Sequence, residues 1–591
     1  MKLSKFAAET LESKYKKECD KDVQDVFIRA AYAFADNEDH ANRIKNYIKN
    51  RWFCPSTPIL ANAPKRVSFG KDFHDNFTFD KFDKKYVGRQ MPISCFLSYV
   101  DDTVEGLIEH TSEIRFLSII GGGCAGHWSD IRANIEGGKS PGPIPFIKTI
   151  DSDVLAYHQA GTRRGSYAAY LNISHPSIEE FINGRLPTGG DINRKFINIH
   201  YGVNLTDEFL ECVKLDKDFN LVCPHTKKVI KTINARRLWY TLLEVRHKTG
   251  EPYLIHIDEM NRLMPIQLKN KGYRINGSNL CTEITLPTNK NRTGVCCLSS
   301  LNVEFFDEWQ HDINIVEDCI RYLDNVLEYF IRYGSAYPYL SKAVLSAEKE
   351  RSVGLGTMGL HNFFMKNKIP FDSVLARAFN NKIYKTIYQR AVKASKQLAI
   401  ERGEPEDMVG SGRRNAHVLA IAPNANTSIF LGASPSIEPL RANFYHHKTS
   451  SGINLIKNRY LIDYLKNDLG WSDTKINKLI KNSIINNGSV QQEEDLPKEA
   501  KEIFKTAVEI DQHILVILAA DRQNYIDQAQ SLNLFFPAEV KMSYLNSVHW
   551  DAMYKYKLKS LYYLRSEPID KAKVDELFLE NNGKECSFCE S

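Results

Sequence analysis

The amino-acid sequence predicts an α/β protein in which strands and helices alternate over most of the chain. Short apolar runs typical of buried strands occur around Cys95, at residues 253–257 and at residues 418–422, and patterns with helical spacing lie between them. No segment rich in Pro, Gly and Ser divides the 591 residues, and 43% of them are hydrophobic, which is ample for a buried core. We therefore expect one large α/β domain with peripheral helices.

Helical patterns occur near both ends of the chain. Apolar residues at helical spacing between Val23 and Phe34 predict an amphipathic helix near the N-terminus, and the pattern after Asp102 predicts a helix that reaches Ile119. Apolar residues spaced along positions 503–517 predict one long amphipathic helix in that region.

Composition and charge exclude several classes of protein. The 78 basic and 72 acidic residues leave a net charge of only +6, which does not indicate a nucleic-acid partner. The 12 cysteines are too few for a disulfide scaffold, and the charged residues at positions 1–6 do not fit a signal peptide. No uncharged apolar run approaches the roughly 20 residues that a membrane span needs. We expect a cytoplasmic protein with reduced thiols, without a membrane or nucleic-acid partner.

Residues 278–284 place an amide, a thiol and a carboxyl at alternate positions, in Asn279, Cys281 and Glu283. If this segment is extended, the alternation puts all three side chains on one face. Asn279 would then orient a hydroxyl group, Glu283 would move its proton, and Cys281 would present its sulfur to the same part of a polyol. Taken alone, the segment also fits a turn with a buried Cys, a capping Asn and a solvated Glu.

Four further cysteines lie at positions that suit thiol chemistry. Cys95 is in an apolar, strand-like run, and Cys296 follows shortly after the heptapeptide. Cys586 and Cys589 form a C-x-x-C pair near the C-terminus, where a disulfide would close a loop too small to stabilise the fold. Such a pair is better placed to carry reducing equivalents by thiol–disulfide exchange. Cys297, next to Cys296, leaves open which of these two thiols faces a substrate.

Together the motifs resemble those of class I ribonucleotide reductase large subunits, the catalytic or alpha subunits, from about residue 10 to the C-terminus. Each motif is weak alone, but their order along the chain is that of the family. The motifs are the strand of Cys95, Gln159-Ala-Gly-Thr-Arg163-Arg-Gly165, Asn279-Leu-Cys281-Thr-Glu283, Cys296-Cys-Leu-Ser, Pro423-Asn-Ala-Asn-Thr-Ser428 with Ile437-Glu438-Pro439, Tyr562-Tyr563 and the terminal Cys pair.

The resemblance implies a ten-stranded α/β barrel of two half-barrels, with Cys281 on a finger loop that threads the centre. It divides the chain into an N-terminal helical region, residues 1–92, a catalytic barrel, residues 93–570, and a flexible redox tail, residues 571–591. Many members of the family carry an ATP-binding cone ahead of the matching region. Only 94 residues precede Cys95, and they are typical of helical scaffold, so we expect no ATP-cone and no overall activity switch here.

The activity implied by the resemblance is radical-based reduction of ribonucleoside diphosphates to 2′-deoxyribonucleoside diphosphates, for DNA precursor synthesis. Cys281, as a transient thiyl radical, would abstract the 3′ hydrogen. Glu283 would take the 3′-hydroxyl proton as general base, and Asn279 would hold the oxygen.

The resemblance also implies the source of the reducing equivalents. Cys95 and Cys296 would deliver them and end as a disulfide; the Cys-x-Leu-Ser spacing favours Cys296 over Cys297. Cys586 and Cys589 would reduce that disulfide by exchange, and thioredoxin or glutaredoxin would restore the tail.

Substrate phosphates imply a further set of contacts. A helix that starts after residues 418–422 would bind phosphate through its free N–H groups and the positive end of its dipole. A turn Thr and a plain N-cap explain the same residues without a ligand. The candidate substrate-binding residues are Thr57, Ser94, Ala425, Asn426, Thr427 and Ser428.

Asp102 and Arg132 match positions of the family's specificity site, which binds the effectors dTTP, dGTP, dATP and ATP. Gln159 and Arg163 belong to a segment that matches the loop linking the effector and substrate sites, and they are the other two candidate effector-binding residues. Glycines and guanidinium groups in residues 158–165 suit a loop that recognises a phosphate or a base, although a solvated basic loop has the same composition. Asp102 and Arg132 also fit a helix cap and a surface charge. The resemblance implies allosteric control of substrate specificity and a homodimer.

The side chains of this chain cannot generate a radical by themselves, so the chemistry requires a partner with a metal or radical cofactor. Tyr562 and Tyr563 match the pair that relays an electron and a proton from a separate, metal-containing small (beta) subunit to the active-site Cys. Paired tyrosines are otherwise usually core or interface aromatics. We expect no metal or cofactor bound in this chain itself.

Three other interpretations explain parts of the sequence. A cobalamin-dependent reductase shares the Cys, Asn and Glu core, and turnover with adenosylcobalamin in the absence of a second protein would identify it. A nucleotide-binding regulatory protein that has lost catalysis is disfavoured by the retention of the five thiols and the Tyr pair. A zinc protein would need a second Cys pair to complement Cys586 and Cys589, and no matching pair is present.

Overall fold

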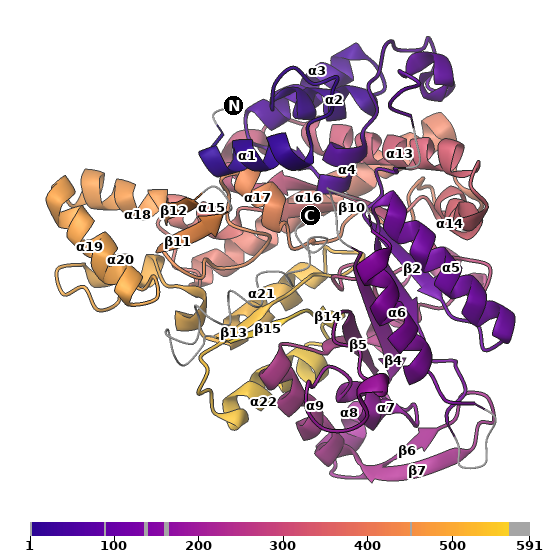
Figure 1. The fold of residues 1–591 in the computed structure, drawn as a ribbon. Coiled ribbons are helices and arrows are strands. Elements are labelled where there is room, and N and C mark those ends of the chain that lie inside the picture. Colours follow the sequence, from indigo (N-terminus) through magenta and orange to yellow (C-terminus); the bar gives the residue numbers. More distant parts are fainter. Residues whose placement is uncertain (1–2, 88–89, 135–139, 159–164, 450–451, 567–591) are drawn as a thin grey trace.

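The computed structural model describes residues 3–87, 90–134, 140–158, 165–449 and 452–566 (Figure 1). N-terminal helices pack on one side of a curled sheet, and a mainly helical lobe, residues 444–504, projects from the molecule.

The N-terminal region is helical, as predicted. It contains α1 (Lys5–Lys14), α2 (Asp25–Ala33) and α3 (Glu38–Lys49). Ser4 and Asn37 cap α1 and α3 by accepting hydrogen bonds from backbone N–H groups of the first turn. The buried guanidinium of Arg29 donates to Asp20 at 3.0 Å and to the carbonyl of Ala63 at 2.7 Å, so it ties α2 to the segments on both sides of it.

Five neighbouring parallel strands form one half of the main sheet. They run in the order β2 (Cys95–Tyr99), β3 (Gly123–His127), β4 (Tyr167–Asn172), β5 (His200–Leu205) and β8 (Tyr253–His256). Parallel neighbours need long crossover connections, and helices supply them here. These are α5 (Val104–Ile120), α6 (Ile144–Ala156), α7 (Ile178–Ile182), α8 (Asp207–Lys214) and α9 (Ala235–Thr249).

The second half of the sheet is built on β9 (Gly294–Asn302) and β10 (Val353–Met358), which are parallel to each other. Between them the chain forms α12 (Phe306–Trp309), α13 (Ile315–Gly334) and α14 (Ser341–Glu350). Single bridges then join Leu355 to Leu419 and Ile421 to Gln530. β9 is antiparallel to β2, so the two halves meet where Cys95 lies opposite Cys296.

The main sheet holds nine strands among the described residues, because β1 (Phe53–Pro55) and β14 (Ser560–Leu561) complete its edges. The other strands form three pairs: β6 (Asp218–Val222) with β7 (Val229–Asn234), β11 (Phe444–Thr449) with β12 (Gly452–Lys457), and β13 (Leu534–Phe536) with β15 (Leu564–Ser566). The remaining helices are α4 (Thr57–Asn62), α10 (Ile257–Leu263), α11 (Ile266–Asn270), α15 (Leu360–Lys366), α16 (Val374–Arg402), α17 (Ala425–Leu431), α18 (Arg459–Asp463), α19 (Asp473–Ile485), α20 (Lys498–Ile503), α21 (Gln512–Gln523) and α22 (Met542–Trp550).

A buried ion cluster fixes α13 against β10 and α16. The carboxylate of Asp324, which has no exposed surface, accepts hydrogen bonds from Arg351 at 2.8 Å, Arg402 at 2.9 Å and Arg414 at 3.0 Å. One carboxylate is thus surrounded by three guanidinium groups. Loss of this charge would remove one anionic partner from each of the three guanidinium groups.

The prediction of one long helix over residues 503–517 was wrong. The helix α20 ends at Ile503, and α21 begins only at Gln512. Two local caps separate the helices: Thr506 and Glu509 form a capping box, and the carboxylate of Asp511 accepts the N–H of His513. The apolar spacing continues across the break, but the two helices contribute to different apolar clusters: Ile503 of α20 packs in the cluster of the projecting lobe, and Leu515 of α21 packs in the main core.

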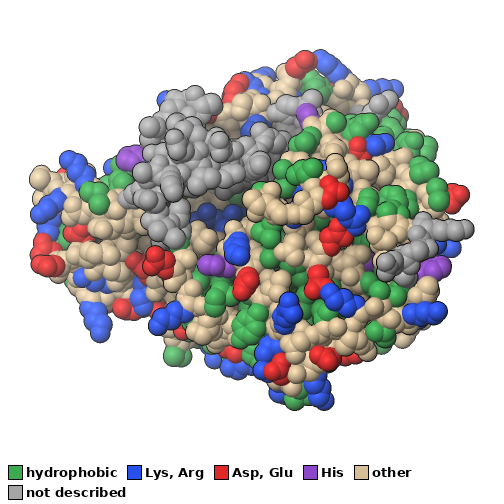
Figure 2. Space-filling model, turned by 60° about the horizontal axis from the view of Figure 1, so that its bottom comes forward, with side chains coloured by type: hydrophobic (Ala, Val, Ile, Leu, Met, Phe, Trp, Pro, Cys, Tyr) green, Lys and Arg blue, Asp and Glu red, His purple; other side chains and the backbone are tan. Residues whose placement is uncertain are grey.

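Charged side chains of both signs are interspersed on the face shown in Figure 2, in keeping with the small net charge. Within the described ranges, no helix combines the length and apolar character that crossing a membrane requires.

Candidate active site

The heptapeptide 278–284 lies in the interior as a finger without regular secondary structure. Asn279, Cys281 and Glu283 are all at most 3% exposed. The segment is not extended, because the chain turns at residues 280–282 and Thr282 has a φ of 70°, in the left-handed region. The alternative of a turn around a buried Cys describes this backbone, but Glu283 is buried and not solvated. The N–H of Thr282 donates to the carbonyl of Asn279 across this turn at 3.4 Å. A turn, and not strand alternation, therefore brings the amide and the carboxyl together.

Side chains from three distant segments hold the finger. The hydroxyl of Tyr170, on β4, donates to the carbonyl of Asn279. Ser531 donates to the carbonyl of Cys281 at 2.6 Å. Burial lowers the pKa of His127 to about 4, so the ring is neutral at pH 7. Its Nε2–H donates to the carbonyl of Ser278 at 3.1 Å.

Cys95 and Cys296 are directly opposite each other on the antiparallel strands β2 and β9. Residues paired in this way have Cα atoms about 4.5–5.5 Å apart and side chains on the same face. A disulfide needs a Cα separation of roughly 4.4–6.8 Å, so these two residues meet its distance requirement. Both side chains are buried. The strand pairing thus brings two cysteine side chains together at one point.

Cys296 and Cys297 lie on opposite faces of β9, as successive side chains on a strand do. Cys296 packs in one apolar cluster with Cys95 and with Ile284 of the finger. The sulfur of Cys297 lies 3.4 Å from the carbonyl of Leu323, on α13. Cys296, and not Cys297, is therefore on the face of β9 that carries Cys95.

The finger contacts this thiol pair directly. The side-chain amide of Asn279 donates to the sulfur of Cys95 at 3.1 Å, and this sulfur lies 3.9 Å from the carboxyl of Glu283. The hydroxyl oxygen of Ser531 lies 3.1 Å from the other oxygen of Glu283. Burial raises the pKa of Glu283 to about 7, although the hydrogen bonds to the carboxylate favour its charged form. A group with this pKa can both accept and return a proton near neutral pH.

Two residues that sequence reasoning missed position the second thiol. Gln528 donates to the sulfur of Cys296 at 3.6 Å and to the carbonyl of Val353 at 3.1 Å, and it accepts the N–H of Thr285 at 3.2 Å. The buried ammonium of Lys559 donates to three successive carbonyls of the Gln528 segment. Burial raises the pKa of Cys296 well above its usual value, so this thiol is protonated at neutral pH. No sequence pattern marks a lone Gln or Lys for such a role.

Tyr562 and Tyr563 lie between β14 and β15, with ring centroids 4.2 Å apart. They share one buried cluster with Cys281 and with Tyr253, whose ring centroid is 4.8 Å from that of Tyr562. The rings of Tyr253, Tyr562 and Tyr563 therefore form one contiguous aromatic group in the apolar cluster that also contains Cys281.

The predicted phosphate contacts gather around β9. Thr57 is the first residue of α4, directly after β1, and Ser94 precedes β2; the hydroxyls of Ser56 and Ser94 are 3.3 Å apart. Ala425, Asn426, Thr427 and Ser428 form the first turn of α17, as expected. Asn424, which precedes them in the left-handed conformation, accepts a hydrogen bond from Ser300 on β9 at 3.0 Å. These segments end near the thiol pair.

The structure describes two of the four predicted effector-binding residues, Asp102 and Arg132. The structure brings Asp102 and Arg132 together as an ion pair, with the guanidinium 2.9 Å from the carboxylate, so each is neutralised by the other. They follow β2 and β3, at the ends of these strands away from Cys95. Gln159 and Arg163, like Cys586 and Cys589 of the predicted tail, lie outside the described residues.

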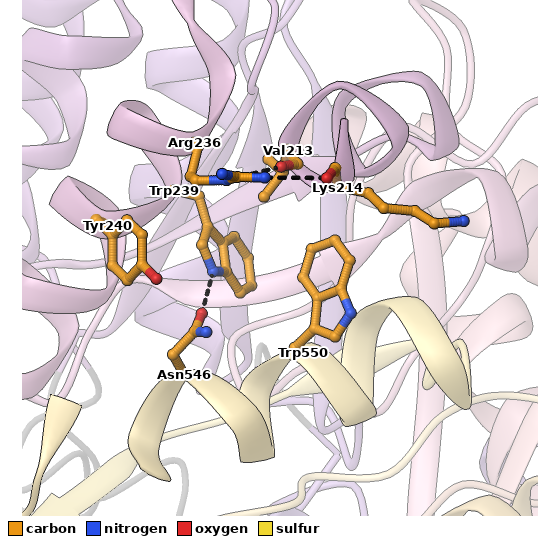
Figure 3. Close-up of a pocket in the computed structure, with 7 residues that line it drawn as sticks. All are labelled: Val213, Lys214, Arg236, Trp239, Tyr240, Asn546 and Trp550. Carbon is orange, nitrogen blue, oxygen red and sulfur yellow. Dashed lines mark hydrogen bonds between the residues drawn. The ribbon is translucent and has the colours of Figure 1, made fainter. Parts of the chain in front are cut away.

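A separate surface pocket lies between α8, α9 and α22 (Figure 3). Two of its aromatic side chains, Trp239 and Trp550, meet edge to face, and Trp239 donates to Asn546 at 2.7 Å. Its lining contains no cysteine and none of the predicted site residues. The residues that line it are Val213, Lys214, Arg236, Trp239, Tyr240, Asn546 and Trp550.

Comparison with known proteins assigns this fold and site to a family. The model described as "Ribonucleotide reductase, barrel domain" matches residues 93–411 and 405–564, and the model described as "Ribonucleotide reductase, all-alpha domain" matches residues 1–67. The chain belongs to the ribonucleotide reductase large-subunit family. The barrel and the helical N-terminal region expected from the sequence are thereby confirmed.

Individual relatives agree with this assignment. A ribonucleoside-diphosphate reductase large subunit of Invertebrate iridescent virus 3 is 39% identical over 641 aligned positions, covering 98% of this chain and 97% of the relative. A Frog virus 3 (isolate Goorha) protein, described as a candidate large subunit, is 46% identical over 527 positions, covering 89% and 88%. Among solved structures, the class Id ribonucleotide reductase alpha subunit of Actinobacillus ureae is similar, with a TM-score of 0.81, 33% identity and coverage of 96% and 97%.

Proposed function

We propose that this protein reduces ribonucleoside diphosphates to 2′-deoxyribonucleoside diphosphates, as the catalytic subunit of a class I ribonucleotide reductase. The observation that carries the proposal is the pairing of Cys95 with Cys296 across two strands, with Asn279 and Glu283 of the finger in contact with the first thiol. This arrangement joins a two-electron reductant, a hydrogen-bond donor and an acid–base group.

The proposed reaction starts with Cys281 as a thiyl radical, which takes the 3′ hydrogen of the ribose and later returns it. Glu283 accepts the 3′-hydroxyl proton, and Asn279 exchanges its bond with the Cys95 sulfur for one with the 3′ oxygen. The C2′–OH bond breaks and the oxygen leaves as water. Cys95 and Cys296 supply two electrons and two protons and become a disulfide, so the sum is ribose plus two thiols giving deoxyribose, water and a disulfide.

The protonation states favour this order of events. At neutral pH the raised pKa of Cys296 keeps a hydrogen on its sulfur, which the departing hydroxyl requires. Glu283, with a pKa of about 7, is ionised in a substantial share of molecules and can take a proton. Its contacts with Cys95 and Ser531 place this exchange beside the reacting thiol.

The remaining parts of the cycle are also proposals. The proposed domains are a helical region, residues 1–92, a catalytic barrel, residues 93–570, and a tail, residues 571–591. The tail cysteines, Cys586 and Cys589, would reduce the Cys95–Cys296 disulfide. Thioredoxin or glutaredoxin would then reduce the tail. The radical would come from a metal-containing small subunit by way of Tyr562 and Tyr563.

The same proposal covers the ligands and the setting of the enzyme. First-turn N–H groups of α17, with Thr57 and Ser94 nearby, would bind the substrate diphosphate. Nucleoside triphosphates would bind near the Asp102–Arg132 pair, with Gln159 and Arg163 as further contacts, and would control substrate specificity in a homodimer. To bind the effector phosphates, Arg132 would have to give up part of its contact with the Asp102 carboxylate. We expect the enzyme to work in the cytoplasm, where its thiols stay reduced.

The test is reduction of CDP by the purified protein with its cognate small subunit and thioredoxin, with and without dTTP, dGTP, dATP or ATP. We expect dCDP only when both proteins are present and a rate that depends on the effector. Full turnover with adenosylcobalamin and no second protein would overturn the assignment to class I. A complete lack of dCDP with an active small subunit would overturn the proposed reaction.

A matched pair of variants tests the thiol assignment. Cys296→Ser should abolish multiple turnover, because no disulfide can form with Cys95. Cys297→Ser changes the neighbouring thiol, which faces α13, and should keep steady-state activity. Full activity with thioredoxin in the Cys296→Ser variant would contradict the assignment.

A further inference from the structure

Tyr563 is bonded to a group of polar residues that the proposed reaction does not use. Its phenol oxygen lies 3.2 Å from Nδ1 of His200, the first residue of β5, and the two rings meet edge to face. The same nitrogen is 2.7 Å from the carboxylate of Glu251, in the segment between α9 and β8. Arg185 donates to that carboxylate at 3.0 and 3.1 Å. A chain of polar contacts thus leads from the oxygen of Tyr563 through His200 and Glu251 to Arg185.

The geometry determines which atom carries the proton. Glu251 is 2% exposed, yet Arg185, His200 and the N–H of Tyr201 outweigh the effect of burial and lower the pKa of this carboxyl, so it is ionised at neutral pH. An ionised carboxylate 2.7 Å from a ring nitrogen requires a hydrogen between them, because two lone pairs would repel each other. Nδ1 of His200 is therefore protonated. Its single hydrogen is shared in a three-centre bond: the carboxylate of Glu251, at 2.7 Å, accepts the stronger branch, and the oxygen of Tyr563, at 3.2 Å, accepts the weaker one.

A donor at this position suits a tyrosine that is oxidised and reduced in turn. A phenol oxygen accepts a hydrogen bond, and so does the oxygen of a phenoxyl radical, which has lost its own hydrogen. An N–H donor keeps its partner in both states. A hydrogen-bond acceptor in the same place would lose its partner whenever the radical formed, which costs about as much as a lost buried hydrogen bond.

From this arrangement we infer that His200, oriented by Glu251, is a positioning residue for radical transfer: it donates to the oxygen of Tyr563 in the phenol and in the radical. The inference rests on the proposed passage of the radical through Tyr562 and Tyr563. When the radical moves inward, one electron and one proton pass from the hydroxyl of Tyr562 to the oxygen of Tyr563, so the atoms balance. His200 keeps its proton throughout.

Replacement of His200 separates a donor role from a role as proton acceptor. Asn places its side-chain N–H close to the position of Nδ1, whereas Leu and Met have no polar hydrogen there. With the cognate small subunit and saturating effector, we expect His200→Leu to lower kcat about tenfold or more, with KM for CDP unchanged. His200→Asn should stay within about threefold of the unmodified protein, because it keeps the donor. His200→Met is a second variant without a donor, in case the Leu variant does not fold.

The outcomes are distinguishable from failure of the proposed function. If Tyr563→Phe keeps turnover, the radical does not pass through this tyrosine and that part of the proposed function fails. If Tyr563→Phe is inactive while folded His200→Leu or His200→Met has unchanged kcat, only the inference about His200 is overturned. Equal loss of kcat in the Asn, Leu and Met variants also overturns it, since it would indicate that His200 transfers a proton or holds the local fold.

Discussion

Replacement of Glu283 by Gln should stabilise the protein at alkaline pH while abolishing its proposed activity. Burial raises the pKa of this carboxyl from an ordinary value of 4.5 to about 7. The folded protein therefore binds the proton more tightly than the unfolded chain does, and stability falls as pH rises from 4.5 through 7. Gln has no proton to lose, so its variant escapes this penalty.

The magnitude follows from the two pKa values. A difference of about 2.5 pKa units corresponds to about 3 kcal/mol at pH 8.5, where the group is ionised in both states, and to less than about 1 kcal/mol at pH 5. For a chain of this length, 3 kcal/mol corresponds to a shift in Tm of about 2–3 °C. The comparison of two pH values cancels any constant effect of the amide on packing.

The assay is thermal unfolding of both proteins at pH 5 and pH 8.5, together with CDP reduction. We expect the Tm difference between Glu283→Gln and the unmodified protein to be about 2–3 °C more favourable to the variant at the higher pH. Glu348→Gln is a suitable control, because this residue is exposed on α14. The same Tm difference at both pH values would refute the raised pKa, and an active Glu283→Gln enzyme would refute the role as general base.

Three further changes test the site and its support. Gly354→Ala places a Cβ 2.4 Å from Leu298 and 3.2 Å from the sulfur of Cys296. It should lower the free energy of unfolding by about 1–3 kcal/mol and slow CDP reduction. An unchanged free energy of unfolding together with an unchanged rate would contradict this packing. Asp324→Asn should cost about 3–5 kcal/mol by denaturant unfolding, because it removes the carboxylate that Arg351, Arg402 and Arg414 share and leaves Arg414 without its ion pair. A loss below about 1 kcal/mol would contradict this. Cys586→Ser should allow one turnover of pre-reduced enzyme but not a second with thioredoxin; continued turnover would exclude the tail.

The sequence predicted the elements that depend on local patterns. The strand of Cys95, the N-terminal helices and the helix that starts at Ala425 follow from apolar periodicity and from residues near their ends. Periodicity could not show the break between α20 and α21, because Ile503, Ala507 and Ile510 keep helical spacing across it. It also could not show that Thr282 is left-handed, since the surrounding packing imposes that turn.

From the sequence, the residues of the candidate site could be predicted only where they lie in motifs of the family. The pairing of Cys95 with Cys296 spans 201 positions and depends on strand register, which no local pattern contains. The site also receives hydrogen bonds from the last part of the chain, from Ser531, Gln528 and Lys559. Such contacts are set by the tertiary fold. A single sequence considered alone therefore cannot distinguish these residues from ordinary polar side chains.

The most direct test of the account is to map the cysteines after a single turnover. Fully reduced protein is mixed with its small subunit and CDP in the absence of any external thiol, and a double variant without Cys586 and Cys589 prevents exchange with the tail. Peptide mass spectrometry then locates the disulfide. The account predicts one link between Cys95 and Cys296 for each dCDP formed, and dCDP formed while these two thiols remain reduced would contradict it.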